Sequence, residues 1–481
     1  MNLHDVIHVS LAIDIIISIF KTTWKDAYYD DAKQLNNDNN QNSNTVENEL
    51  SLALQNLWSA ASSANLLDQL NQLEQFNFLS NHEQDLLNHN FRYDLIPKLL
   101  NIFQWHNCFE IQLEAMQVLA LLVKLDSLSP ILTKLHTDGI SLLVKLLSSP
   151  YDELAIKSLR VLQNYTSYEY VLNCGLIQEL AKVITLNKSV QFLRAAASAL
   201  KLIARGEASL RNEVVIDLLG IVTVLIQFDD IELICDIIWT LKYLTDYRDE
   251  NVQNAIDARV IPRIFDILAS GSPELSTPAL KTLGNVVAGN SKQAKFVVDM
   301  KLLPLLKKLL TRSDSLQQKE IFWVFSNVAV DESRLLQQLI NEGIVSMMLN
   351  YIQEESVVSN EAIWVISNAI QYGTEAQVLQ LLENYNLTEF LCNTLLKFEN
   401  SQVLYNVIVA MSALLTKIEG FPDLSETLQA NVLQKIEFLS NHHHQSWLNL
   451  PANQLLVIIN GKYEKQKQSE LCSKYDIDDL T

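Results

Sequence analysis

Two stretches of the sequence decide its fold: Glu320-Ile-Phe-Trp323-Val-Phe-Ser-Asn327 and Glu361-Ala-Ile-Trp364-Val-Ile-Ser-Asn368. Their Trp residues are 41 positions apart. A Trp and an Asn four positions apart lie on the same face of a helix. Recurrence of one pattern at a spacing of about 20 to 50 residues is typical of stacked repeats. The two stretches therefore predict helices that belong to neighbouring repeats of a solenoid.

The same register continues towards both ends of the chain. Steps of nearly the same length back from Trp323 reach Lys281, followed by Asn285, and then Trp239, followed by Tyr243. Apolar residues at helical spacing surround each of these positions, so we expect helices throughout, with Trp and Asn concentrated in the later repeats. Further steps reach positions where the Trp is absent: Ser198, Lys157 and Met116 upstream, and Asn406 downstream.

A second element recurs between these helices, namely a Gly or Pro just before an apolar run. Gly is favoured at the end of one helix, and Pro is tolerated in the first turn of the next. Alternating apolar and polar series bounded by hairpin turns are missing from the sequence. We therefore predict an all-α chain of helices joined by short turns. The recurring residues are Gly139, Gly175, Pro262, Pro304 and Gly343.

The length of 481 residues exceeds that of one ordinary hydrophobic core, but no linker rich in Pro, Gly or Ser divides the chain. A solenoid accounts for both facts, because each repeat buries its surface only against its neighbours. We expect an apolar and acidic N-terminal segment at 1–32, forming a packed helix, and a disordered Asn-rich link at 33–48. The solenoid is expected at 49–460 and a polar C-terminal tail at 461–481.

Composition excludes several classes of function. A net charge of −20 argues against nucleic acid as the main partner and favours a cationic one, although the same acidity would also keep a long solenoid soluble. Five Cys without close pairing are typical of a reducing compartment. The apolar stretch 6–20 is too short and too interrupted to span a membrane.

Chemistry-bearing motifs are also missing. The run His442-His443-His444 does not share one helix face, and no further ligands stand at a recognisable spacing, so we expect neither a metal nor a cofactor. The sequence contains no phosphate-binding loop, dinucleotide fingerprint or nucleophile elbow. We therefore do not expect an enzyme.

The repeats resemble those of importin α, a family of nuclear import adaptors. The resemblance covers roughly residues 100 to 460 and is specific from 239 to 370. It implies a right-handed superhelical solenoid of about 9–10 armadillo repeats, each of roughly 42 residues. In that family, the third helix of each repeat lines a concave groove that holds an extended nuclear localisation signal. The segments that carry the resemblance are 279–289, 319–327 and 360–368, with 239–246 and 434–442 beside them.

The resemblance also assigns residues to the signal peptide. In the family, Trp side chains stack on the stems of Lys and Arg, and Asn amides bond the peptide backbone. An indole face does attract cations, and Asn both donates and accepts hydrogen bonds. The family's linking region corresponds to Trp239, Tyr243 and Asp246. Its minor signal-binding site corresponds to Asn285, Glu320, Trp323, Asn327, Glu361, Trp364 and Asn368.

Two departures from the family pattern define an alternative. The earlier repeats, which form the family's major site, lack the Trp and Asn, so we expect that half of the groove to be degenerate. Residues 1–50 hold three Lys and no Arg against eight acids, whereas the family's importin-β-binding segment is basic. Either importin β is not bound in that way, or the true N-terminus differs. A recycling exportin is a further possible partner. The resemblance implies an adaptor in the cytoplasm and nucleus; the alternative is an armadillo scaffold that no longer acts in cargo import.

Overall fold

The described part of the chain consists of helices and contains no strand. The computed structural model describes Ala53, Asn56 and residues 96–97, 99–104, 109–125, 139–163, 168–185, 188–206, 210–246, 248–330, 332–352, 355–418, 430–441 and 446–475. The expected N-terminal segment and the Asn-rich link lie outside these residues, as does the His442–His444 run. The chain divides into two compact units, Met1–Ala199 and Leu200–Thr481.

The first unit is made of short helices and two longer ones. Helix α6 contacts α9, and α8 packs beside both η4 and α9. The last helix, α12, continues across the boundary into the second unit. The elements are α6 (Phe109–Leu125), α8 (Gly139–Lys145), the 3₁₀ helix η4 (Leu146–Ser148), α9 (Asp152–Gln163), α10 (Tyr168–Asn173), α11 (Leu176–Ile184) and α12 (Val190–Gly206).

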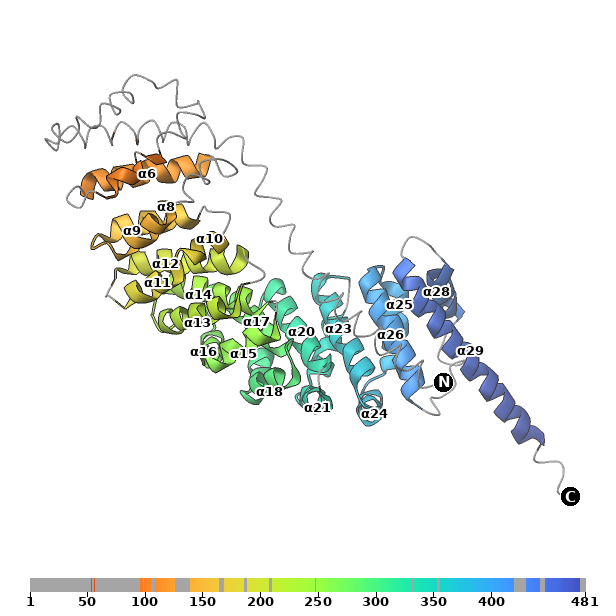
Figure 1. Ribbon diagram of the computed structural model, residues 1–481. Helices are drawn as coiled ribbons and strands as arrows, with labels where there is room; N and C mark the ends of the chain where they lie inside the picture. The colour runs from red at the N-terminus through yellow and green to blue at the C-terminus, as the bar shows by residue number, and fades with distance from the viewer. Residues whose placement is uncertain are drawn as a thin grey trace, which may run out of the picture. The chain divides into compact units, whose positions relative to one another are not determined.

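The second unit repeats a group of two short helices followed by a longer one (Figure 1). The group that starts at α13 departs from this rule, because α13 is one continuous helix where other groups have two. The elements are α13 (Asn212–Leu225), α14 (Ile231–Thr245), α15 (Asp249–Asp257), α16 (Ile261–Ser270), α17 (Pro273–Val287), α18 (Ser291–Asp299), α19 (Leu302–Leu310), α20 (Ser315–Val330), α21 (Ser333–Asn341), α22 (Ile344–Leu349), α23 (Val357–Tyr372), α24 (Glu375–Asn384), α25 (Leu387–Lys397), α26 (Ser401–Lys417), α28 (Ala430–Asn441) and α29 (Ser446–Tyr475).

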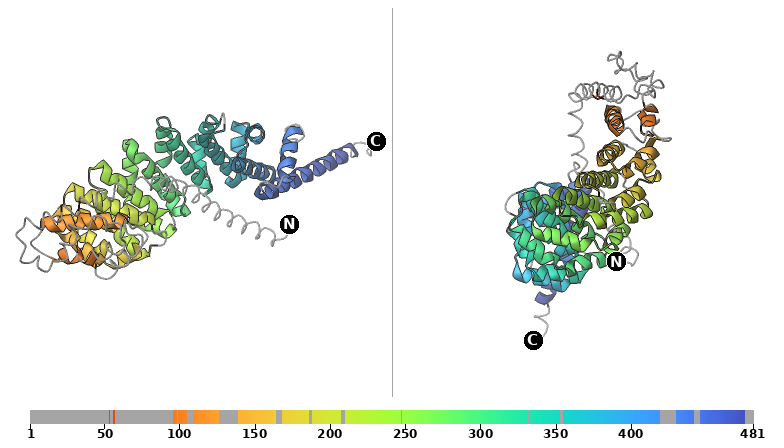
Figure 2. Two further views of the ribbon diagram at one scale, coloured as in Figure 1. Left: turned by 90° about the horizontal axis from the view of Figure 1, so that it is seen from above. Right: turned by 90° about the vertical axis from the view of Figure 1, so that its left-hand side faces the viewer.

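The longer helices of the second unit form a continuous row, and we call them the ladder helices: α14, α17, α20, α23, α26 and α29. Each contacts the next in chain order, and the left view of Figure 2 shows the second unit's helices following one another from green to blue. Each inner face is apolar. On α20, Ile321, Phe322 and Phe325 are completely buried, whereas Trp323 and Asn327 on another face are half-buried. The row therefore presents equivalent faces of successive helices side by side.

A left-handed residue marks the turn before the second short helix of several repeats. Lys301 (φ 70°) and Gly343 (φ 70°) directly precede α19 and α22, and Gly175 (φ 84°) precedes α11 in the first unit. Arg259 (φ 60°) lies two residues before α16. Positions 259, 301 and 343 are evenly spaced, so the backbone repeats with the period found in the sequence. Gly adopts this left-handed conformation without a steric cost, and it does so at Gly175 and Gly343. At the other two repeats Arg259 and Lys301 adopt it, although it is sterically unfavourable for residues with a Cβ atom.

The last described helix, α29, crosses residue 460, where the sequence predicts the solenoid to end and a polar tail to begin. Helix α29 continues to Tyr475, past the expected boundary at residue 460, and it contacts both α26 and α28. Among the described residues, no helix is both long and apolar enough to cross a membrane. The described residues also contain no group of three His, Cys, Asp or Glu side chains placed to hold a metal ion.

Candidate functional site

Half-buried aromatic side chains follow the row of ladder helices. Trp239 on α14, Trp323 on α20 and Trp364 on α23 are all half-buried, so none of these indoles is sealed inside the core. The series continues further than the sequence register indicated. Tyr405 on α26 is half-buried, and its ring lies 5.6 Å, between centroids, from that of Trp447 on α29.

A register step that was one position too long explains why Tyr405 was missed. The step beyond Trp364 reached Asn406, which is buried, whereas the spacing between Trp323 and Trp364, applied once more, reaches Tyr405. A similar error occurs upstream. The register reached Met116, which is completely buried, and Gln117 beside it is the side chain that Lys157 reaches, with Nζ 2.8 Å from Oε1. Strict repetition of the Trp323–Trp364 spacing would have found the aromatic residue on α26 from the sequence.

Trp323 rests against the preceding ladder helix. A Cβ added at Gly284 on α17 would lie 2.7 Å from Cε3 and 2.9 Å from Cη2 of the indole. Only glycine leaves room for the ring in this position. The six-membered ring is therefore fixed by packing on one side, while the side chain as a whole stays half-exposed.

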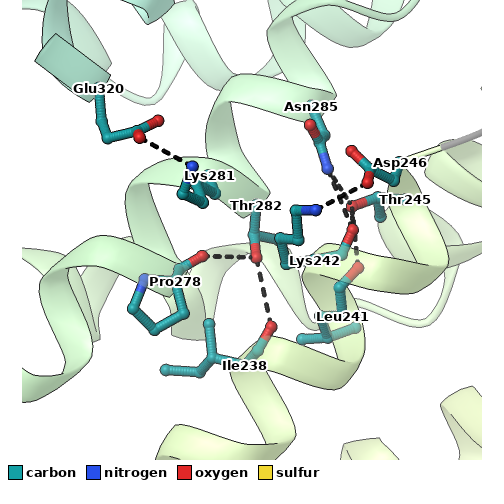
Figure 3. A network of polar contacts seen from close by, with 10 residues as sticks. All are labelled: Ile238, Leu241, Lys242, Thr245, Asp246, Pro278, Lys281, Thr282, Asn285 and Glu320. Atoms are coloured by element: carbon teal, nitrogen blue, oxygen red, sulfur yellow. Dashed lines mark hydrogen bonds and ion pairs between the residues drawn. The ribbon is translucent and has the colours of Figure 1, made fainter. Parts of the chain in front are cut away.

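The three Asn amides of the predicted site differ in their hydrogen bonds. Asn285 Nδ2 donates to the Lys242 carbonyl and to Thr245 Oγ1 on α14, each at 3.1 Å (Figure 3). Asn368 Nδ2 on α23 donates to the Ser326 carbonyl on α20 at 3.2 Å. These two amides therefore tie neighbouring ladder helices together. Asn327 Nδ2 is buried and has no hydrogen-bond partner.

Unsatisfied polar atoms are concentrated on three ladder helices. Among the described residues, four buried side-chain nitrogen or oxygen atoms lack a partner, and all four lie on α20, α23 and α26. Buried polar groups are normally hydrogen-bonded, and each exception needs a physical reason. Of these four atoms, Asn327 Nδ2 is the one that belongs to a residue of the predicted site. The atoms are Asn327 Nδ2, Asn360 Oδ1, Ser367 Oγ and Gln402 Nε2.

The two predicted carboxylates have different partners. Glu320 Oε1 lies 2.7 Å from Lys281 Nζ, and both side chains are buried (Figure 3). Lys281 occupies the position on α17 that corresponds to Trp323 on α20. The Glu320 carboxylate is therefore neutralised by the chain itself, an interaction that the sequence analysis did not foresee.

Glu361 is buried to the same extent as Glu320, but it makes no hydrogen bond or ion pair with the described residues. Burial raises the pKa of the Glu361 carboxyl from 4.5 to about 8. The Lys319 ammonium opposes this rise and the Glu320 carboxylate adds to it. A buried carboxyl without a counter-ion is costly when ionised, so a cation that entered the site would favour its charged form.

The residues matched to the linking region form a separate cluster on α14. The rings of Trp239 and Tyr243 are stacked with centroids 5.8 Å apart. Lys242 Nζ lies 4.8 Å from the Tyr243 ring centroid and 2.7 Å from Asp246 Oδ2. Burial raises the pKa of the Tyr243 hydroxyl. An internal lysine already engages both Tyr243 and Asp246, so this cluster differs from Glu361 on α23, which forms no ion pair with a lysine of the described residues.

Comparison with known proteins gives relatives for part of the chain. No protein-family model matches it. It is 32% identical over 183 residues to importin subunit alpha-1a of Oryza sativa subsp. japonica, covering 38% of this chain and 35% of that protein. It is 25% identical over 267 residues to importin subunit alpha-8 of Arabidopsis thaliana, covering 54% of this chain and 60% of the relative. The chain thus spans less than two thirds of the length of these relatives.

Solved structures give the fold over a larger part of the chain. An engineered protein superposes with a TM-score of 0.64 over 87% of this chain and 96% of its own length, at 20% identity. At that identity the likeness concerns the fold alone. The repeated three-helix groups and the importin relatives lead to one conclusion: the chain is a divergent, importin-α-like protein with an all-α armadillo-repeat fold.

Proposed function

We propose that the protein binds basic, Lys/Arg-rich segments of the nuclear-localisation-signal type on ladder helices α20 and α23, and that it acts as an adaptor in nuclear protein import. One observation carries the proposal: the half-exposed indoles of Trp323 and Trp364 lie on the helices that also carry Glu361 and the unpaired amide of Asn327. A basic side chain of a peptide could pair with the Glu361 carboxylate, and a free backbone carbonyl of the peptide could accept a hydrogen bond from the Asn327 amide.

The chain contains an example of the interaction that Glu361 lacks. Lys281 on α17 reaches Glu320 on the next ladder helix. One repeat later, Glu361 stands in the place of Glu320 and Trp323 in the place of Lys281. A ligand ammonium group beside the Trp323 indole would take the part that the Lys281 ammonium plays one repeat earlier. The space beside Glu361 and Trp323 therefore suits a lysine side chain of a ligand.

The physical chemistry favours a cationic ligand at each step. A cation over an indole face gains about 0.5–2 kcal/mol, depending on how far it is desolvated. A charge-assisted hydrogen bond to a carboxylate is about twice as strong as a neutral one. The net charge of −20 attracts a basic segment over a longer range. Asn327 Nδ2 can donate to a peptide carbonyl, which would satisfy an otherwise orphaned buried donor.

The wider role follows from the relatives, which are named as importin subunits. In this proposal the protein is a binding adaptor rather than an enzyme, needs no cofactor, and works in the cytoplasm and nucleus. Basic cargo signals are its main partners, with importin β and a recycling exportin as further ones. The earlier long helices, α6, α9 and α12, contribute little to signal binding.

The test is a fluorescence-polarisation titration of a labelled Lys/Arg-rich peptide against the wild-type protein and a Trp323→Ala/Trp364→Ala variant. We expect the double substitution to abolish binding, with Glu361→Gln weakening it at least tenfold. Leu316→Ala is the matched control, because Leu316 is 73% exposed on α20, two turns before Trp323. Unchanged affinity in the double variant would refute the site, provided that circular dichroism shows intact helices.

The alternative is an armadillo scaffold outside cargo import. It is favoured by two internal contacts, because Lys157 bonds to Gln117 and Lys281 pairs with Glu320, so these polar groups bind each other instead of a ligand. A scaffold would retain its partners when Trp323 and Trp364 are replaced, and a basic peptide would not compete with them. A competition experiment with the labelled peptide therefore separates the two functions.

A further inference from the structure

Acidic side chains recur three positions before the aromatic position of the ladder. They are Asp236 on α14, Glu320 on α20 and Glu361 on α23, which precede Trp239, Trp323 and Trp364 respectively. On α17 the equivalent residue is Pro278, which carries no charge. The ladder thus offers three carboxylates in equivalent places, each a potential subsite for a basic side chain.

The chain itself occupies two of these three subsites. Lys201 on α12 forms an ion pair with Asp236, and Lys281 on α17 forms one with Glu320. In both cases the lysine comes from the long helix that precedes the carboxylate in the chain. Glu361 forms no such ion pair, because Trp323 stands on α20 at the place of Lys281, and the Lys319 ammonium on α20 lowers the pKa of the Glu361 carboxyl without forming an ion pair with it. The side chains of Lys281 and Glu320 are only 8% and 6% exposed, so water does little to screen their attraction.

We propose that Lys201 and Lys281 are built-in substitutes for ligand lysines, which close the acidic subsites on α14 and α20 and leave Glu361 as the one at which a basic ligand residue is bound. The inference rests on the proposed function and defines its ligand more narrowly. The protein selects segments with one compact basic cluster, centred on Glu361. Additional basic residues along the segment gain nothing from the earlier ladder helices.

Repulsion strengthens this selection. A ligand lysine that approached Glu320 would meet the Lys281 ammonium, and it could bind only by expelling that buried charge. On α14, Lys242 adds a further positive charge beside Tyr243 and Asp246. The earlier ladder helices are therefore unfavourable for a second basic cluster. The protein would thus discriminate between basic segments by repelling a second basic cluster as well as by attracting the first.

The first test uses the wild-type protein and three labelled peptides in a Gly/Ser background. One peptide carries a single Lys-Arg-Lys cluster. The second carries the same cluster with further lysines on its N-terminal side, and the third carries them on its C-terminal side. We expect all three to bind with the same affinity within about threefold at 0.15 M salt. A gain of more than tenfold for an extended peptide would overturn the inference while leaving the proposed function intact. Failure of every peptide to bind would refute both.

The second test opens the closed subsite. Lys281→Met removes the ammonium but keeps an unbranched stem, so Glu320 becomes available. We expect at least a tenfold gain in affinity for one extended peptide and no gain for the single-cluster peptide. The matched control is Lys281→Met/Glu320→Gln, which replaces both partners and should remove the gain. An equal gain in the double variant, or no gain in a folded Lys281→Met protein, would contradict the inference.

Discussion

At the residue scale, Glu361 and Glu320 occupy equivalent positions on neighbouring ladder helices but have different surroundings. The Glu320 carboxylate, at the equivalent position of the preceding ladder helix, is neutralised by Lys281. Glu361 is equally buried and carries no such partner. Burial without a counter-ion disfavours the charged form of the Glu361 carboxyl, whereas the Glu320 carboxylate is paired. The proposed binding of a basic ligand residue at Glu361 would account for this difference.

Peptide binding should depend on pH through Glu361. The pKa of this carboxyl is raised to about 8 in the free protein, so at pH 6 the group is neutral and must release a proton to pair with a ligand lysine. We expect affinity to rise with pH, by up to about tenfold per unit, between pH 6 and 8 and to level off above that range. Fluorescence polarisation from pH 6 to 9 measures the effect.

The control for this dependence is Glu361→Gln, which removes the titrating group and keeps the shape of the side chain. Its affinity should be low and independent of pH over the same range. Glu375→Gln, an exposed acid on α24, should behave like the wild type. A pH dependence that survived in Glu361→Gln would assign the titration to another group.

The position of the Trp323 indole should depend on Gly284, against which the ring packs. In Gly284→Ala, the new Cβ would clash with the six-membered ring, because it would lie 2.7 Å from Cε3 without a shift. We expect the ring to move, with a shift in tryptophan fluorescence and a loss of peptide affinity approaching that of Trp323→Ala. The measurement combines emission spectra with titration. Gly220→Ala on α13, where a Cβ meets nothing within 4 Å, is the matched control and should change neither.

The sequence predicted the chemical types at this site better than their interactions. Of the Trp and Asn residues four apart in the repeated register, Trp323, Asn327 and Trp364 are half-buried on neighbouring helices, whereas Asn368 is buried. The pairing of Glu320 with Lys281 was not predictable from spacing, because it depends on how two helices that are remote in the sequence pack together. For the same reason, the sequence treated Glu320 and Glu361 as equivalent, whereas the packing gives only one of them a partner.

At the element scale, the turns before the second short helices carry the repeat period in the backbone. Gly343 adopts φ 70° freely, but Lys301 at the preceding repeat adopts the same angle at a steric cost. Lys301 is exposed, so replacing it removes no packing. We expect Lys301→Gly to stabilise the fold by about 0.5–1 kcal/mol. Urea denaturation followed by circular dichroism measures the shift.

The reciprocal substitution checks the cause. In Gly343→Ala, a Cβ would meet nothing within 4 Å, so any change in stability comes from the backbone angle alone. We expect a loss of about 1 kcal/mol. Gly220→Ala lies within helix α13 and should stabilise slightly, because Ala has the higher helix propensity. If Lys301→Gly, Gly343→Ala and Gly220→Ala all changed the free energy of unfolding by the same amount, backbone conformation would be excluded as the cause.

Helix type and period were predictable at this scale, whereas the boundaries were less so. The apolar spacing identified the ladder helices because it repeats over many turns. The single helix α13 and the continuation of α29 to Tyr475 do not follow from the register, which gives the spacing of the ladder helices but not where each helix begins or ends. A drift of one position between successive register steps was enough to exchange Tyr405 for Asn406. An error of one position on a helix moves a side chain by about 100° and therefore from one face to another.

At the scale of the whole molecule, net charge and local site chemistry should affect different rate constants. The charge of −20 acts over many ångströms and steers a basic peptide towards the protein, whereas Glu361 acts only on contact. We expect the association rate constant to fall by about tenfold between 0.05 M and 0.5 M salt, because salt screens the long-range attraction. Stopped-flow fluorescence measures it. Glu361→Gln changes the net charge by at most one unit, so it should keep this salt dependence and instead raise the dissociation rate constant. Loss of the salt dependence in that single variant would mean that the site, and not the acidic chain as a whole, attracts the ligand.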